Sequence, residues 1–138
     1  MRPLAPRGHA VSLLAALTIT AAGCGDGEAT TPIPARLSAI ETEIFARNCT
    51  FSSCHGASSP QMGMSLVAPT HAALSGVPST EVPSMMRVVP GDPDASYLLQ
   101  KITSAAPLDG VRMPPDQPLA PHKIEAIRLW IAAGAQDD

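Results

Sequence analysis

Apolar residues recur every three or four positions between residues 37 and 48, with charged and polar residues between them. The recurring apolar positions are Leu37, Ile40, Ile44 and Phe45. This period places them on one side of a helix and leaves the other side for solvent. The sequence therefore predicts an amphipathic first helix that ends near Asn48.

The same period returns near the end of the chain. A last helix is predicted from Pro121 to about Ala133, because proline is favourable at the first helical position and Gly134 is a typical C-terminal stop. Its apolar side would carry Ile124, Ile127 and Ile131, with Trp130 beside them.

A further helix is predicted from about Pro93 to Ile102. Asp92 is a favourable N-cap residue, and Pro93 would occupy the first helical position. Asp94 adds negative charge to the first turn, where it interacts favourably with the helix dipole. Leu98 and Ile102 would be buried.

The connecting segments are long and rich in proline. A short helix is expected from Thr70 to Leu74, ended by Gly76, and the segment from Ser84 to Val89 is expected to be extended or irregular. No strand shows convincing alternation. The sequence thus predicts an all-α domain with short helices and long loops. Its four aromatic residues give a thin core, and such cores are commonly stabilised by a disulfide, a metal or a bound group.

The N-terminal segment has the order of charge and hydrophobicity of an export signal. Arg2 and Arg7 precede an uncharged run from Ala10 to Gly23, which is too short to span a bilayer as a helix. The small residues before Cys24 resemble a bacterial lipoprotein signal, in which this cysteine is acylated. Ala21 departs from that pattern, which usually has leucine there, and ordinary cleavage nearby is the alternative.

These features divide the chain into a signal peptide (1–23), a flexible tether (24–36) and one domain (37–138). The mature protein is expected in the cell envelope, anchored to the membrane by lipid and facing the periplasm. Removal of the signal leaves seven basic residues against twelve acidic ones, a net charge near minus five. No basic patch remains to neutralise phosphates, which excludes nucleic-acid binding.

The remaining cysteines, Cys49 and Cys54, would lie in an oxidising compartment, where free thiols rarely persist. His55 follows directly, and the segment resembles the c-type haem attachment signature, in which two cysteines form thioethers with the haem and the histidine ligates iron. That signature usually has two residues between the cysteines, whereas this chain has four, which would have to bulge outward. A disulfide between the cysteines, or a small metal site of these three residues, stays open as an alternative.

Other parts of the chain resemble the planctomycete-type cytochrome c domain and related class I cytochromes. The matching pieces are Val88 to Pro93, Ser96 to Leu98, Arg112 to Pro115, Leu119, Ile127 and Trp130 to Ala135. The resemblance implies a small cytochrome c-like fold around one haem c, bound covalently by Cys49 and Cys54 and ligated by His55. It also implies that the first and last helices cross, with Phe45 and Trp130 near the haem.

The resemblance further implies that Met113 is the distal iron ligand. The residues around it agree, because Pro114 favours an extended Met113 and Pro115 stiffens a loop that could lie over the haem. Met113 as core filler is the alternative, and Arg112 could pair with a haem propionate. Other candidate ligands are Met62, Met64, Met85, Met86, His71 and His122.

With His55 and Met113 on iron, no coordination site would stay open for a substrate. No nucleophile–base pair, phosphate-binding loop or carboxylate cluster indicates catalysis. We therefore expect a monohaem electron carrier that is not an enzyme and that acts with redox partner proteins. The alternative is a haem-free lipoprotein, stabilised by a Cys49–Cys54 disulfide, that serves as a structural or interaction module.

Overall fold

The computed structural model describes Met1 and residues 31–104 and 109–138. The expected signal peptide, the expected lipidation site Cys24 and most of the expected tether lie outside these residues. The described chain consists of helices and long connecting segments, and its β pairings are three isolated bridges that form no sheet. The predicted helical class is therefore confirmed for the described part of the chain. No helix within it is long and apolar enough to cross a membrane.

The first helix runs without a break from Leu37 to Asn48, as predicted. It consists of α1 (Leu37–Ile40), a single π-helical turn η1 (Glu41–Phe45) and α2 (Ala46–Asn48). The backbone stays right-handed helical at both junctions, so the three parts form one rod. The four apolar positions that recur in the sequence are all buried: Leu37, Ile40, Ile44 and Phe45.

A residue from the far end of the chain caps this helix. The N–H of Leu37 donates to Asp138 Oδ1, and the N–H of Ser38 donates to the main-chain oxygen of Asp138, both at 2.8 Å. The preceding Arg36 makes no side-chain cap. Asp138 thus satisfies two of the N–H groups that a helix start leaves unpaired, and it ties the two ends of the domain together.

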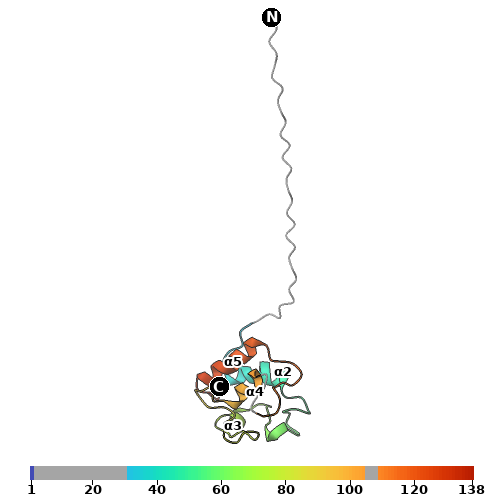
Figure 1. Ribbon diagram of the computed structural model, residues 1–138, viewed down its shortest axis with the longest axis vertical. Helices are drawn as coiled ribbons and strands as arrows, with labels where there is room; N and C mark the ends of the chain where they lie inside the picture. The colour runs from blue at the N-terminus through green and yellow to red at the C-terminus, as the bar shows by residue number, and fades with distance from the viewer. Residues whose placement is uncertain (2–30, 105–108) are drawn as a thin grey trace.

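The last helix, α5 (Pro121–Ala132), packs against α1 and α4 (Tyr97–Thr103). Figure 1 shows α5 beside the first helix, in agreement with the contacts between α1 and α5. Trp130 is buried, and its Nε1–H donates to the oxygen of Gln136 at 2.8 Å. Gly134 follows the helix with a φ of 101°, a left-handed conformation that suits glycine and ends the helix as predicted.

The helix α4 begins four residues later than predicted. Asp92 accepts a hydrogen bond from the N–H of Ala95 at 3.1 Å, but the turn it caps does not continue, because Ser96 has an extended backbone (φ −85°, ψ 117°). The fully buried Ser96 hydroxyl donates to the oxygen of Asp92 and accepts from the N–H of Val89, each at 2.8 Å. These side-chain bonds compete with helical ones, so the helix starts at Tyr97.

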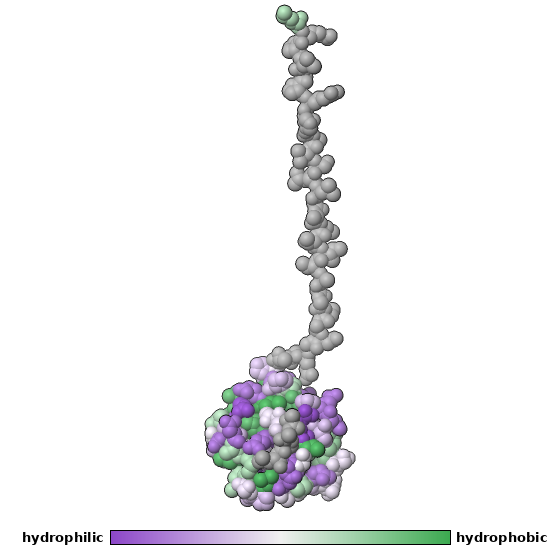
Figure 2. Space-filling model, viewed as in Figure 1, coloured by the Kyte–Doolittle hydropathy of each residue, from purple (hydrophilic) through white to green (hydrophobic). Residues whose placement is uncertain are grey.

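The segments between the helices are irregular, as expected. They include a short 3-10 turn η2 (Gln61–Gly63) and the small helix α3 (His71–Leu74). Thr70 precedes α3, and both its N–H and its hydroxyl donate to Glu41 Oε1, at 2.6 and 2.9 Å. This contact fastens the middle of the chain to the first helix. On the face shown in Figure 2, patches of hydrophobic residues alternate with hydrophilic ones.

Candidate functional site

A cavity of about 400 Å³ lies between the end of the first helix, the cysteine segment, α4 and the loop that precedes α5. Its lining includes all four residues that the sequence assigned to haem binding, namely Cys49, Cys54, His55 and Met113. Its walls are mostly apolar, with Phe45, Leu66, Leu98, Ile102, Leu119 and Ile127 among them. The volume falls in the range of small-molecule and cofactor pockets.

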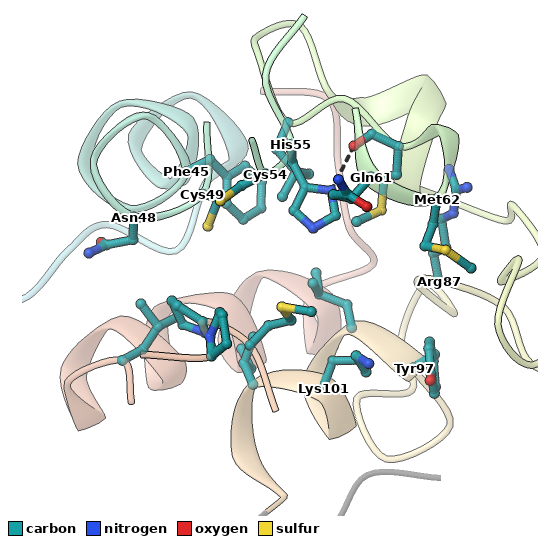
Figure 3. A pocket seen from close by; sticks show the side chains of 18 of the residues that line it. Phe45, Asn48, Cys49, Cys54, His55, Gln61, Met62, Arg87, Tyr97 and Lys101 are labelled. Atoms are coloured by element: carbon teal, nitrogen blue, oxygen red, sulfur yellow. Dashed lines mark hydrogen bonds between the residues drawn. The ribbon is translucent and has the colours of Figure 1, made fainter. Parts of the chain in front are cut away.

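The His55 ring is fixed by one of its nitrogens. Nδ1 lies 2.8 Å from the main-chain oxygen of Met64, and because a carbonyl only accepts, Nδ1 must carry the proton and donate. In the neutral ring this leaves Nε2 with its lone pair. Figure 3 shows the imidazole pointing into the cavity. This bond is typical of metal-binding histidines, in which the ring nitrogen that does not bind the metal donates to a carbonyl or carboxylate.

The backbone closes the cysteine segment into a compact loop. The N–H of His55 donates to the oxygen of Cys49 at 3.0 Å, and the N–H of Cys54 donates to the oxygen of Phe51 at 2.8 Å. Three of the four residues between the cysteines, 51 to 53, are exposed. Two of them, Phe51 and Ser53, also line the cavity, so the expected outward bulge stays a prediction.

Gly56 explains how this loop can close so tightly. It is buried, and a Cβ at this position would lie 3.2 Å from the oxygen of Thr50 and 3.3 Å from the oxygen of Phe51. Both neighbours are backbone atoms, which move only together with the whole loop. A larger residue would therefore push the cysteine segment outward.

Both cysteines are free thiols in the structure, so no disulfide joins them. Burial, and to a smaller extent the nearby Cys54, raises the pKa of Cys49 to about 12, although Lys123 acts in the opposite direction. Cys49 is therefore protonated at neutral pH. A protonated thiol is a poor metal ligand and a poor partner in disulfide exchange.

The small metal site considered from the sequence is not preformed. Among the described residues, no three or more His, Cys, Asp or Glu side chains gather closely enough to hold a metal ion. Cys49, Cys54 and His55 thus line a cavity and do not converge on a position where one metal ion could bind all three.

Met113 reaches the cavity from the side of α4. Its N–H donates to the main-chain oxygen of Lys101 at 2.7 Å, and its side chain is partly buried against the hydrophobic core. Figure 3 shows Lys101 on the wall opposite His55. The structure thus anchors the two expected axial ligands to opposite walls of one cavity.

Four of the six competing ligands lie outside the cavity lining. His71 and His122 are not among the residues that line the cavity, and His71 Nε2 instead lies 2.9 Å from the oxygen of Ala135. Met85 and Met86 also stay outside the lining. Met62 and Met64 do line it, so the cavity lining does not separate them from Met113.

One end of the cavity is polar, and no motif of the sequence indicates it. Lys101 is 7% exposed and pairs with Glu81, with 2.9 Å between Nζ and Oε2. The hydroxyl of Tyr97 also donates to Glu81 Oε2, at 3.0 Å. Burial, followed by the hydrogen bond to Glu81 and the charges of Glu81 and Asp109, raises the pKa of Tyr97 to about 12.

A signal for this cluster was present in the sequence. Lys101 lies between Leu98 and Ile102 on the predicted apolar side of α4, where a lysine is rarely buried without a partner. The partner, Glu81, is 20 positions away in an irregular segment. Only the fold brings the two together.

Arginine also contributes to the polar end. Arg87 lines the cavity, and its guanidinium donates to the oxygen of Ala73 at 2.8 Å and to Thr80 Oγ1 at 3.3 Å. Burial lowers the pKa of Arg87 below its ordinary value. Arg112, the residue considered for a propionate, is not among the lining residues, although its Nε is buried without a hydrogen-bond partner.

The residues present fit a covalently bound haem. The apolar walls suit the porphyrin, the two thiols and the free Nε2 of His55 face the same cavity, and the polar end offers cations for its carboxylates.

Comparison with known proteins agrees with this fit. Residues 52–117 match the family model described as Planctomycete cytochrome C. The matched range includes Cys54, His55 and Met113 and begins three residues after Cys49. No curated protein and no solved structure matches the chain.

Proposed function

We propose that the chain, whose residues 52–117 match the model of the Planctomycete cytochrome C family, acts as a monohaem c-type cytochrome that transfers electrons in the cell envelope. The observation that supports this most strongly is the convergence of Cys49, Cys54, His55 and Met113 on one cavity. These residues span 65 positions of the sequence. Haem c, when bound, supplies one-electron redox chemistry.

Cys49 and Cys54 would hold the group through two thioethers. In each, the thiol S–H would add across a vinyl double bond, so that one C–S and one C–H bond would form and no atom would be lost. The exposed residues 51 to 53 between the cysteines would supply the extra chain length that the four-residue spacing requires.

His55 and Met113 would supply the two axial ligands. The hydrogen bond from His55 Nδ1 to the oxygen of Met64 fixes the ring and leaves Nε2 for iron. The bond from the Met113 N–H to the oxygen of Lys101 holds the thioether on the other side. With both positions taken by side chains, a bound haem iron would keep no open coordination position, and so we infer an electron carrier and not an enzyme.

The polar end would receive the propionates. Arg87 lines the cavity and is the better placed arginine, since Arg112 does not line it. Placing carboxylates at this end leaves the apolar porphyrin body among the hydrophobic side chains. An ion pair to Arg87 would also favour the charged form of its guanidinium, which burial disfavours.

The proposed location in the envelope relies on the N-terminal sequence. Acylation of Cys24 would anchor the domain to the membrane and leave it facing the periplasm, where redox partner proteins would reach it. The haem-free alternative, a lipoprotein module with a Cys49–Cys54 disulfide, is less favoured because both thiols are free in the structure.

The experiment that separates an electron carrier from a haem protein with an open site is the replacement of Met113. In Met113→Ala we expect loss of the near-infrared charge-transfer band of an iron–methionine bond, a lower reduction potential, and rapid carbon monoxide binding to the reduced protein. Met86→Ala is the control, because Met86 is exposed and outside the cavity lining. If the unmutated protein lacks the band and already binds carbon monoxide, the assignment of Met113 is wrong.

A further inference from the structure

Lys101 contacts three residues near the expected distal ligand: Met113 itself, Glu81 and Asp109. Its main-chain oxygen accepts the N–H of Met113 at 2.7 Å. Its side-chain Nζ lies 2.9 Å from Glu81 Oε2 and donates to the main-chain oxygen of Asp109 at 3.0 Å. The loop that contains Met113 is therefore held to α4 by these two contacts of Lys101, and the Tyr97 hydroxyl also lies 3.4 Å from the oxygen of Asp109.

The main-chain contact uses a group that the helix itself leaves free. Lys101 lies in the last turn of α4 (Tyr97–Thr103), where carbonyl groups lack partners within the helix. Met113 supplies the missing donor. The position of the Met113 backbone therefore depends on where the last turn of α4 lies.

The side-chain contacts hold that last turn in place. The Lys101 side chain is 8% exposed and that of Glu81 is 20% exposed, so the ion pair is shielded from water and salt. Tyr97, one turn earlier on α4, donates to the same Glu81 oxygen at 3.0 Å, and Lys101 Nζ lies 5.7 Å from the centre of its ring. Figure 3 shows Lys101 and Tyr97 on the wall opposite His55.

Gly110 shows how closely the loop packs on this pair. A Cβ at Gly110 would lie 3.0 Å from Glu81 Oε1 and 3.1 Å from Lys101 Nζ. The loop between Asp109 and Met113 thus rests directly on the ion pair. Anything that moves the pair also moves the loop that leads to the ligand.

We propose that the ion pair of Lys101 and Glu81 is a positioning device for Met113, which keeps the methionine loop closed over the haem face. This inference rests on the proposed function, since it presumes that Met113 ligates iron. Lys101 acts through Met113 and not as a ligand. When the pair is broken, the loop opens more often and the iron–methionine bond weakens, while the covalent attachment at Cys49 and Cys54 is unaffected.

Two variants of the matured holoprotein test this. Lys101→Met removes the charge and keeps the main-chain oxygen and an unbranched side chain that is one atom shorter. Gly110→Ala disturbs the pair from outside the cavity, because Gly110 is exposed and is not among the lining residues. An effect of the second variant therefore cannot come from direct contact with the haem.

Each variant has a matched control. Gly76 has nearly the same backbone φ as Gly110, +67° against +63°, but a Cβ there would have no atom within 4 Å. Gly76→Ala therefore introduces the same backbone strain without touching the pair. The control for Lys101→Met is Arg128→Met. It removes the positive charge of an exposed ion pair, in which Arg128 Nη1 lies 3.3 Å from Asp94 Oδ1.

We expect Lys101→Met and Gly110→Ala to reduce the near-infrared iron–methionine band. Carbon monoxide association with the reduced protein should become roughly tenfold faster, since contacting residues commonly couple by about one order of magnitude in an equilibrium constant. Covalent haem content should stay the same, and both controls should match the unmutated protein. A band and a rate equal to those of the controls would overturn the positioning role but leave the electron-carrier function standing.

A measurement on the unmutated holoprotein keeps the inference testable if the variants do not fold. Amide hydrogen exchange should protect the Met113 N–H strongly relative to the N–H of the exposed Val111 two residues earlier. Equal exchange at the two positions would show that the contact with Lys101 is not kept, and would overturn the inference. An unmutated protein with no iron–methionine band would overturn both this inference and the assignment of Met113.

Discussion

The His55 ring is oriented by a hydrogen bond from its Nδ1 to the main-chain oxygen of Met64, at 2.8 Å. Because the acceptor is backbone, the contact is independent of the side chain at position 64. It does depend on the loop from 56 to 64, which turns back so that the N–H of Leu66 also donates to the oxygen of His55 at 2.8 Å. The proximal ligand is thus oriented by the loop that follows it.

Replacing His55 should therefore open a space that a free imidazole can occupy. In His55→Ala we expect the low-spin visible spectrum to be lost and then restored when imidazole is added, since the cavity and the acceptor on Met64 remain. His71→Ala is the control, because His71 contacts Ala135 and is not among the lining residues. A His55→Ala protein with an unchanged spectrum would show that another group is the proximal ligand.

The buried thiol of Cys49 gives a pH prediction for the haem-free protein. Its pKa of about 12 means that little thiolate exists near pH 8, so alkylation in the folded state should be slow. In urea, where an ordinary thiol pKa near 8.5 applies, the same cysteine should react much faster. Peptide mass spectrometry after timed alkylation measures both rates, and equal rates in the two conditions would contradict the raised pKa.

The same shift predicts how stability depends on pH. Because the pKa of Cys49 is higher in the folded state than in the unfolded state, its contribution to the free energy of unfolding is fully present below the unfolded pKa. That contribution decreases as the pH rises from about 8.5 towards 12. Cys49→Ser in the haem-free protein should lack this part of the pH dependence, as urea titrations at several pH values would show.

Much of the fold could be predicted because its signals are local. The periodic apolar residues predict the first and last helices, and Gly134 predicts where the last one ends. The predicted start of α4 was wrong because the Ser96 hydroxyl accepts from the N–H of Val89 and donates to the oxygen of Asp92. These hydrogen bonds form only once the chain has folded. A strong capping pattern at Asp92 thus produced one turn and not a longer helix.

The candidate site could be predicted only in part, for the same physical reason. The step from Cys54 to His55 is a local pattern, and the structure places both around the cavity with Met113. The pair of Lys101 and Glu81 joins segments that carry no shared motif, so the sequence did not reveal it. The signal peptide and Cys24 lie outside the described residues and stay predictions.

The lipid anchor is tested by replacing Cys24. If this cysteine is acylated, Cys24→Ser should remain unprocessed or appear in the soluble fraction of the envelope, whereas the unmutated protein should sediment with membranes. The covalent haem content should not differ, because Cys24 lies outside the predicted domain. A Cys24→Ser protein that is processed normally and still fractionates with membranes would contradict the anchor.

The central claim, a haem bound covalently through Cys49 and Cys54, is tested most directly by the mass of the denatured protein made together with a cytochrome c maturation system. We predict that the unfolded chain keeps its visible absorbance and that its mass exceeds that of the polypeptide by one haem, because each thiol adds to a vinyl group without loss of atoms. Cys49→Ser and Cys54→Ser should each keep the haem through a single thioether, and the double variant should lose it on denaturation. A colourless chain whose mass is lower than the polypeptide by two hydrogens would show a Cys49–Cys54 disulfide and contradict the claim.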